Sequence, residues 1–365
     1  MQTPQGRSAD TSEAPAAVHG QEQYMSELAT NFIILDLEWN GHPEGKTGQN
    51  EAMPFEIIEI GAVKLNSARE IIGEFRSYIK PQVYPKLHYK TRELLGITYK
   101  DLKQAKSFPE VIEEFFTWCG RGYRFCTWGS MDLTEIQRNL AYYGIARYFT
   151  KPVLYYNLQQ VFGKIYDEPT ARTLEYAVNR LEIPQDRPFH DALDDARYTA
   201  EVFRRLDLTQ VLKNFSVDYY RHPLTKAEEI YLNYEDYSEF ISREYSRREE
   251  LMRAHSVITL TCPICGARLT REVHWFSGNV KNYYCLGTCK KHGYVEGKLH
   301  LKRTPDMHYF AVKTSRIVTA TEAGGITSRY EALSERRQAK KPLRPRAAKP
   351  LLRRAADLAN KKNKT

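Results

Sequence analysis

The chain has 365 residues, of which 42% are hydrophobic and 27% charged, as is typical of a soluble globular protein with a sizeable core. No apolar run approaches the roughly 18 residues that cross a bilayer, so we expect no membrane-spanning segment. Six cysteines are too few for a secreted disulfide scaffold, and four of them form two close pairs, which favours metal binding and a reducing, cytoplasmic setting.

The net charge of +9 is concentrated at one end of the chain. Twelve Lys or Arg residues and a single acid lie between Arg336 and Thr365, so the remainder is nearly balanced. Such a basic segment either attracts a polyanion, most often nucleic acid, or serves solubility alone.

Pattern and composition divide the chain into five predicted regions. They are a disordered leader (1–30), an α/β domain (31–206), a helical connector (207–255), a small cysteine-bearing β unit (256–313) and a basic disordered tail (314–365).

Within 31–206 the elements alternate. Strand patterns at 32–38, 56–65 and 70–81 predict an antiparallel meander, followed by a helix at 107–119, a strand at 123–128 and a helix at 130–144. A last helix begins near His190 and has a ridge of alanines suited to packing on a sheet. This order predicts a mixed sheet covered by helices on both sides.

The first strand, FIILDLEWN, contains Asp36 and Glu38 within an apolar run. Residues two apart in a strand share a face, so these carboxylates would lie side by side next to a core. Buried like charges either shift their pKa values or bind a cation. Asp132, at the start of a helix, is a candidate partner. Asp191, Asp194 and Asp195, in the first turns of the helix that begins near His190, are further candidates, although each acid alone is also explained by solvation or the helix dipole.

The order Asp-x-Glu, Asp, then His-x4-Asp resembles the DEDDh family of 3′-to-5′ exonucleases, which contains RNase T, oligoribonuclease and polymerase proofreading domains. The phrases PFEIIEIGAV, YIKP, LLGIT, FPEVIEEF and TWGSMD are most similar to the branch that contains histone-mRNA exonucleases and KapD-like proteins. Asp191 and Asp194 fall outside the motif and are interpreted as helix-surface acids.

The resemblance implies an RNase H-like fold with two Mg²⁺ or Mn²⁺ ions. Asp36, Glu38, Asp132 and Asp195 would hold the ions, and His190 would take a proton from the attacking water. Leu37, Trp39 and Asn40 would contact substrate, and Trp39 either stacks on the terminal base or packs at the strand end. The implied partner is single-stranded nucleic acid, with RNA favoured.

A second set of candidate ligands follows near residue 260. The spacing of Cys262, Cys265, Cys285 and Cys289 is close to that of a zinc ribbon, which predicts one structural Zn²⁺. Because the second pair is one residue longer than usual, His292 is an alternative to Cys289 as fourth ligand. Basic and aromatic residues interleaved in this region suit either single-stranded nucleic acid or a docking protein, and they are Arg268, Arg271, His274, Trp275, Lys281, Tyr283, Tyr284, Lys290 and Lys291.

Two classes of function remain open from the sequence. One is a metal-dependent 3′-to-5′ exonuclease acting on RNA or single-stranded DNA, and the other is a nuclease-like binding or regulatory protein without essential catalysis. The complete set of four acids and a histidine favours the enzyme.

Overall fold

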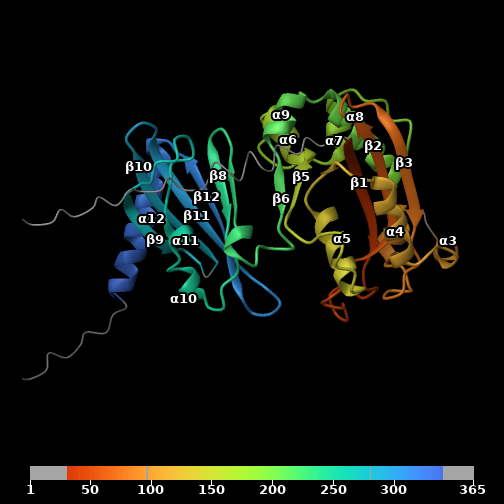
Figure 1. Cartoon of the computed structure of the whole chain (residues 1–365), viewed down its shortest axis with the longest axis horizontal. Coiled ribbons are helices and arrows are strands. Elements are labelled where there is room, and N and C mark those ends of the chain that lie inside the picture. Colours follow the sequence, from red (N-terminus) through yellow and green to blue (C-terminus); the bar gives the residue numbers. More distant parts are fainter. Residues whose placement is uncertain (1–30, 96–97, 280, 340–365) are drawn as a thin grey trace, which may run out of the picture.

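The protein contains two six-stranded sheets that lie side by side, each with its own helices (Figure 1). The computed structural model describes residues 31–339 except 96–97 and 280. The predicted leader and the end of the predicted tail, 340–365, lie outside these described residues. No helix in the described ranges has the length and apolar character needed to cross a membrane.

The first sheet is mixed, as predicted. Its strands are β1 (Asn31–Asn40), β2 (Glu56–Asn66), β3 (Ile71–Tyr78), β4 (Tyr123–Thr127), β5 (Val153–Asn157) and β6 (Ser216–Asp218), in the spatial order β3-β2-β1-β4-β5-β6. The β1–β4 and β4–β5 pairs are parallel and the other pairs are antiparallel. The predicted meander and the following strand–helix units are therefore confirmed.

Helices cover both faces of this sheet. They are α2 (Tyr89–Leu95), α3 (Tyr99–Lys103), α4 (Phe108–Cys119), α5 (Met131–Tyr142), α6 (Leu158–Ile165), α7 (Leu174–Arg180), α8 (Ala192–Arg205) and α9 (Leu208–Lys213). Alternate residues of β1 divide the core, so that Ile33, Leu35 and Leu37 pack with α4 and α5. Phe32 and Ile34 point to the other face and pack with α6, α7 and α8. Asp36 and Glu38 continue this second face.

Residues 207–255 do not form the predicted helical connector. After the short helix α9, β6 completes the first sheet, and β7 (Ile230–Asn233) and β8 (Tyr237–Ile241) begin the second. These strands, IYLN and YSEFI, are only four and five residues long, and no long apolar run marks them, so the sequence pattern did not reveal them.

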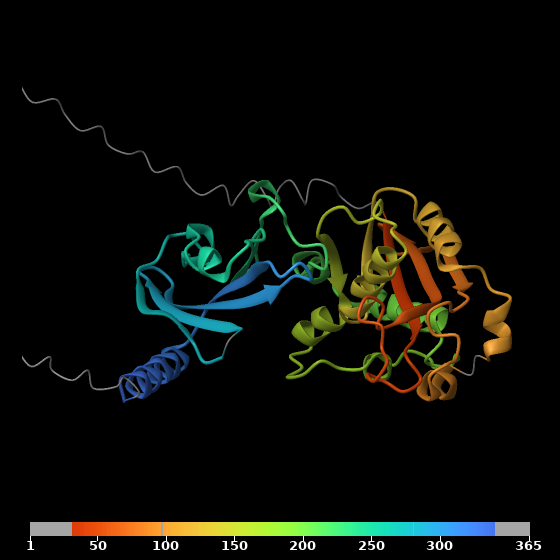
Figure 2. The same ribbon diagram turned by 90° about the horizontal axis from the view of Figure 1, so that it is seen from below.

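The second sheet is antiparallel throughout and larger than the predicted zinc-ribbon unit. Its strand order is β7-β8-β12-β11-β10-β9, with β9 (Arg271–Ser277), β10 (Asn282–Cys289), β11 (Gly293–Arg303) and β12 (Tyr309–Ile317). Short helical segments η1 (Lys226–Glu228), α10 (Arg248–Leu251) and α11 (His255–Ile258) accompany it. The long helix α12 (Ala320–Ala339) packs on β9 and β10 through Ala323 and Ile326, so the start of the predicted disordered tail is helical (Figure 2).

The two sheets share one apolar cluster. Ile230, Leu232 and Phe310 of the second sheet belong to the same buried cluster as Phe32 of β1 and Phe215 beside β6. The Tyr234 hydroxyl also donates to the Phe215 carbonyl at 2.9 Å. The chain beyond residue 206 is therefore part of the packing of the first domain.

Gly61 of β2 permits the closest approach between a helix and the first sheet. It pairs with Asp36 across β1 and β2, and a Cβ at this position would lie 2.1 Å from the Ala192 carbonyl carbon at the start of α8. A side chain there cannot fit without moving the helix start.

We predict that Gly61→Ala lowers the free energy of unfolding by about 1–3 kcal/mol, the range of an overpacked core. It should also weaken activity, since the displaced helix start bears His190 and Asp195. The control is Gly73→Ala on β3, where a Cβ meets its nearest atom at 3.6 Å. Chemical denaturation measures the free energy of unfolding of Gly61→Ala and of Gly73→Ala. Equal stability of the two variants would contradict this role of Gly61.

Candidate active site and metal centre

Three elements bring four carboxylates of the predicted motif together. Asp36 and Glu38 lie on β1, Asp132 lies in the first turn of α5, and Asp195 lies in the first turn of α8. Each reaches the same place because the parallel strands β1 and β4 end at one edge of the sheet and α8 crosses over β1 and β2. The structure thus assembles residues that are up to 159 positions apart in the sequence.

Burial raises the pKa of all four acids, and repulsion by other members of the set adds to this for Asp36 and Glu38. Desolvation is the largest cause of the raised pKa of Asp36, followed by the charges of Asp132 and Asp195. Desolvation also raises the pKa of Glu38 to about 8, of Asp132 to about 7 and of Asp195 to about 6. In Asp132 and Asp195, backbone hydrogen bonds oppose this rise. The site therefore favours protons or cations over free carboxylates.

Glu59 is a fifth acid at the site, and the sequence analysis missed it. It lies directly opposite Glu38 in the β1–β2 pair and is fully buried. Desolvation raises the pKa of Glu59 to about 7, and Glu59 in turn raises that of Glu38. The signal was present in the sequence, because Glu59 lies between two isoleucines in a buried strand, just as Asp36 lies between two leucines.

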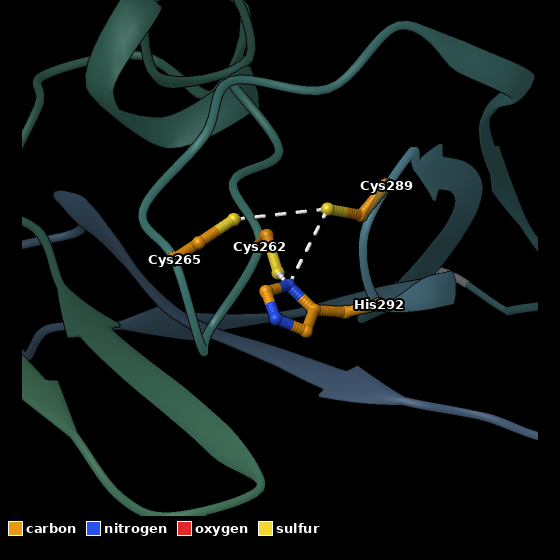
Figure 3. Close-up of side chains that lie close together, drawn as sticks. All are labelled: Cys262, Cys265, Cys289 and His292. Carbon is orange, nitrogen blue, oxygen red and sulfur yellow. Dashed lines mark hydrogen bonds between the residues drawn. The ribbon is translucent and has the colours of Figure 1, made fainter.

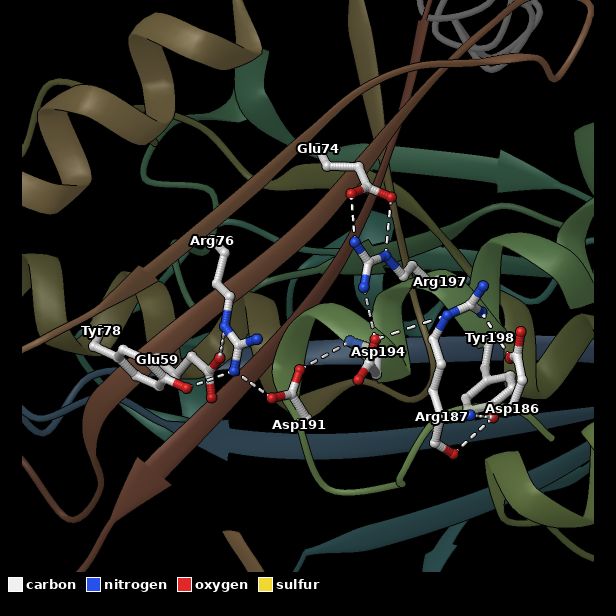
Figure 4. A network of polar contacts seen from close by, with 10 residues as sticks. All are labelled: Glu59, Glu74, Arg76, Tyr78, Asp186, Arg187, Asp191, Asp194, Arg197 and Tyr198. Carbon is white, nitrogen blue, oxygen red and sulfur yellow. Dashed lines mark hydrogen bonds and ion pairs between the residues drawn. The ribbon is translucent and has the colours of Figure 1, made fainter. Parts of the chain in front are cut away.

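Arg76 of β3 partly compensates this acidity. Its guanidinium forms an ion pair with Glu59 at 2.9 Å and a second one with Asp191, the N-cap of α8 (Figure 4). Asp191 accepts a hydrogen bond from the Asp194 backbone N–H at 3.1 Å. Asp191 is therefore more than the surface acid we expected, since it ties the start of α8 to the outer strand.

Asp194 extends the same network away from the site. Arg197 donates to Asp194 at 2.8 Å and to both oxygens of Glu74 on β3, at 2.9 and 2.6 Å (Figure 4). These pairs fix α8 against β3, as expected of a residue with a structural role.

His190 lies just before α8, exposed, and its side chain is close to two of the acids. One ligand atom each from Glu38, His190 and Asp195 fall within 4.8 Å of one another. The His190 backbone has a φ of 66° and its N–H donates to Asp195 at 3.1 Å. This left-handed conformation, uncommon outside glycine, aims the imidazole at the carboxylates.

A cleft of about 520 Å³ opens beside these residues. Glu38 and His190 line its inner end. The remaining wall has aromatic and basic side chains from the 41–55 segment and the start of α2, and it includes Trp39, His42, Lys46, Phe55, His88 and Lys90. Trp39 follows a bulge in β1, and its ring lies 6.0 Å from that of Phe55.

Two of the three predicted substrate contacts have buried side chains. Asn40 is fully buried, donates to the Tyr84 and Lys86 carbonyls and accepts from the His88 N–H, so it anchors the loop before α2. The Leu37 side chain is 3% exposed and belongs to the core, while its backbone N–H forms a hydrogen bond to the Asp132 carboxylate. Trp39 lines the cleft and is half-buried, and its contact with substrate stays a prediction.

The four acids fit a divalent cation. One oxygen of Asp195 is buried without a hydrogen-bond partner among the described residues, and every member of the set is an oxygen donor of the kind that Mg²⁺ and Mn²⁺ prefer. A bound cation would reverse the repulsion that raises these pKa values.

A second cluster lies at one end of the second sheet (Figure 3). Ligand atoms of Cys262, Cys265, Cys289 and His292 are all within 4.8 Å of one another. The sulfurs of Cys265 and Cys289 are 3.7 Å apart, and Nδ1 of His292 is 3.4 Å from Cys262 and 3.6 Å from Cys289. A tetrahedral Zn²⁺ with Zn–S bonds of about 2.3 Å would place its sulfurs about 3.8 Å apart, so the set fits one zinc ion.

The predicted ligand Cys285 is not part of this cluster. Cys285 and Cys289 lie on the same strand, β10, four residues apart, and a strand rises about 3.3 Å per residue, so the two lie roughly 13 Å apart. Cys285 is instead fully buried, and burial raises the pKa of its thiol to about 12. The pairing that forms is Cys289-x2-His292, at the turn after β10.

The exonuclease family of RNase T matches residues 33–203. The chain is 28% identical over 160 residues to rat 3′-5′ exoribonuclease 1, covering 41% of this chain and 46% of that protein. It is 27% identical over 207 residues to the probable 3′-5′ exonuclease KapD of Bacillus subtilis, covering 51% of this chain and 98% of KapD.

The chain thus spans about half the length of the rat relative that it matches and nearly all of KapD. Among solved structures, the nuclease domain of 3′hExo, described as a DEDDh family member bound to rAMP, is 25% identical with a TM-score of 0.43, covering 48% of this chain and 91% of that one. The family match ends at residue 203, before the second sheet.

We predict that the zinc-loaded protein loses stability as pH rises from about 5.5 to 8 when no Mg²⁺ or Mn²⁺ is added. The pKa of Glu38 is about 8 when folded but near 4.3 in an unfolded chain, so folded protein retains a proton that unfolded protein has released. Raising the pH therefore favours unfolding. Thermal unfolding should show a smaller decrease in Tm for Glu38→Gln, which mimics the protonated side chain, and identical profiles would argue against a desolvated Glu38.

We predict one zinc per chain in wild-type protein and in Cys285→Ala, and a loss of zinc in Cys262→Ser and His292→Ala. The last two variants each remove one of the four clustered ligands, and structural zinc sites contribute folding energy directly. Elemental analysis of the purified protein measures the stoichiometry. Zinc loss in Cys285→Ala with full retention in His292→Ala would restore the ligand set expected from the sequence.

Proposed function

We propose that this protein is a metal-dependent 3′-to-5′ exonuclease of the DEDDh type acting on single-stranded RNA, since residues 33–203 match the exonuclease family of RNase T. The observation that carries the proposal is the group of four desolvated acids with His190, next to an open cleft with aromatic and basic walls. A domain that only binds nucleic acid gains nothing from buried carboxylates that repel each other.

Asp36, Glu38, Asp132 and Asp195 would hold two Mg²⁺ or Mn²⁺ ions. When bound, the ions supply charge neutralisation for the attacking and leaving oxygens of phosphodiester cleavage. His190 accepts a proton from the attacking water, a role that its exposed position beside Glu38 and Asp195 supports. The Asp195 carboxylate accepts the His190 backbone N–H and thereby helps to hold the residue in place.

Different residues of the cleft would contact the base and the phosphates at the 3′ end of the substrate. Trp39 and Phe55 offer aromatic surface for the terminal base, and stacking of this kind is worth about 1–3 kcal/mol per base. Lys46 and Lys90 place positive charge at the cleft wall, where phosphates would lie. RNA as substrate is supported by the relatives described as exoribonucleases.

We predict that Asp36→Asn and Asp195→Asn abolish shortening of a 5′-labelled RNA, because each removes a cation ligand while keeping the fold. His190→Asn should lower the rate by about 10²–10⁴-fold, the usual scale for a general base, and asparagine tolerates the left-handed backbone at this position. Asp186→Asn, at an exposed carboxylate outside the site, serves as the control.

The assay compares matched RNA and DNA oligonucleotides, single- and double-stranded, with Mg²⁺ or Mn²⁺. A ladder that shortens from the 3′ end, faster on single-stranded RNA, is the expected result. Undiminished cleavage by Asp36→Asn would reject the site. Tight binding of RNA by wild-type protein without any cleavage would favour the nucleic-acid-binding alternative.

A further inference from the structure

One face of the second sheet has a row of basic side chains, of which the sequence analysis named only Lys281. Lys298, His300 and Lys302 alternate along β11, so their side chains point to the same face at intervals of about 6.6 Å. Lys281 lies beside them, since its carbonyl accepts the backbone N–H of Leu301. We call these four residues the basic strip.

No carboxylate in the described part of the chain forms an ion pair with the three lysines of the strip. On the same face, Glu296 is already paired with Arg316 at 2.8 Å, and Glu239 is buried, which raises its pKa. The charges also affect one another, because the pKa of His300 is lowered by burial and then by Lys302, Lys298 and Lys281. The strip is therefore an uncompensated cationic surface.

Aromatic rings lie at both ends of the strip. The Lys302 ammonium is 5.4 Å from the ring centroid of Tyr219, just after β6. At the other end, Tyr284 of β10 lies opposite Lys298 of β11. The Arg329 guanidinium of α12 is 4.9 Å from the ring centroid of Tyr284. The strip thus runs along β11 from the side of Tyr219 to the side of α12.

The residues first expected to bind nucleic acid are distributed differently. Arg271 and Trp275 donate hydrogen bonds to the Ile258 carbonyl at 3.1 and 2.9 Å, so both side chains pack against α11. Tyr283 packs in the same cluster, whereas its neighbour Tyr284 faces the strip. Strand alternation separates them.

We propose that the basic strip, with Tyr219 and Tyr284, binds the phosphate backbone and bases of a single-stranded nucleic acid, as a grip on substrate remote from the catalytic acids. Positive charge that follows the phosphate backbone, together with aromatic rings on which bases stack, binds single strands without sequence preference. The inference rests on the proposed function for its substrate class but concerns a separate surface. The shared apolar cluster means that truncating the chain would damage the first domain, so the test uses point variants of the full chain.

The test variant is Lys298→Gln/Lys302→Gln, which removes two charges but retains most of each side chain. Lys213→Gln/Lys226→Gln is the matched control, because both lysines are exposed and outside the strip. Fluorescence anisotropy measures binding of a labelled 30-nucleotide single strand without Mg²⁺ or Mn²⁺. Zinc content and thermal unfolding confirm that each variant is folded.

The strip variant should bind the 30-mer roughly tenfold more weakly, and its slope of log K against log salt should be shallower by about 1.4, or about 0.7 for each lost contact. Hydrolysis of a tetranucleotide should not change. Wild-type affinity and slope in the strip variant, or an equal loss in the control pair, would overturn the inference.

The two proposals fail separately. If wild-type protein cleaves nothing but the strip variant still loses affinity, the exonuclease proposal falls and the grip stands. If wild-type protein cleaves RNA and the strip variant binds the 30-mer as tightly as wild-type protein, the exonuclease proposal stands and the grip proposal falls. The strip would then suit an acidic protein instead.

Discussion

The rest of the first domain is organised around five carboxylates that are crowded together and partly or fully removed from solvent. Asp36, Glu38, Glu59, Asp132 and Asp195 influence one another or lose solvent together, and each has a raised pKa. Unpaired charges in such a place are costly, so the fold must hold them by other contacts until cations bind. The raised pKa values express that cost in free energy, because a group that resists ionisation in the folded protein opposes folding at higher pH.

Those other contacts surround the acids and converge on the start of α8. Gly61 lets the helix lie against β2 opposite Asp36, and Arg76 binds both Glu59 and the N-cap Asp191. Arg76 therefore neutralises Glu59, which is not one of the four expected cation ligands. It also fixes the start of the helix that bears Asp195. The positive φ of His190 belongs to the same arrangement, since the turn into α8 aims its side chain at the site.

The sequence was informative where burial and charge conflict within a short segment. Asp36 in an apolar strand predicted a cation site, and the family motif then supplied its distant partners. It was less informative where strand geometry decides. Asn40 follows the motif but turns inward, and Cys285 has the right residue type but lies too far along β10 from Cys289 to share an ion. The full extent of the second sheet was missed because its first two strands are short and have no long apolar run.

The Cys/His cluster and the first sheet are connected by a single strand. β11 begins one residue after His292, and at Lys302 its side chain reaches Tyr219 beside the first sheet. The clustered side chains lie at one end of this strand, and the apolar cluster around Phe310 and Ile230 fixes the neighbouring strands at the other. A metal ion held by the cluster would therefore help to determine where the basic strip lies, because the register of β11 sets which side chains face the strip and which face the core.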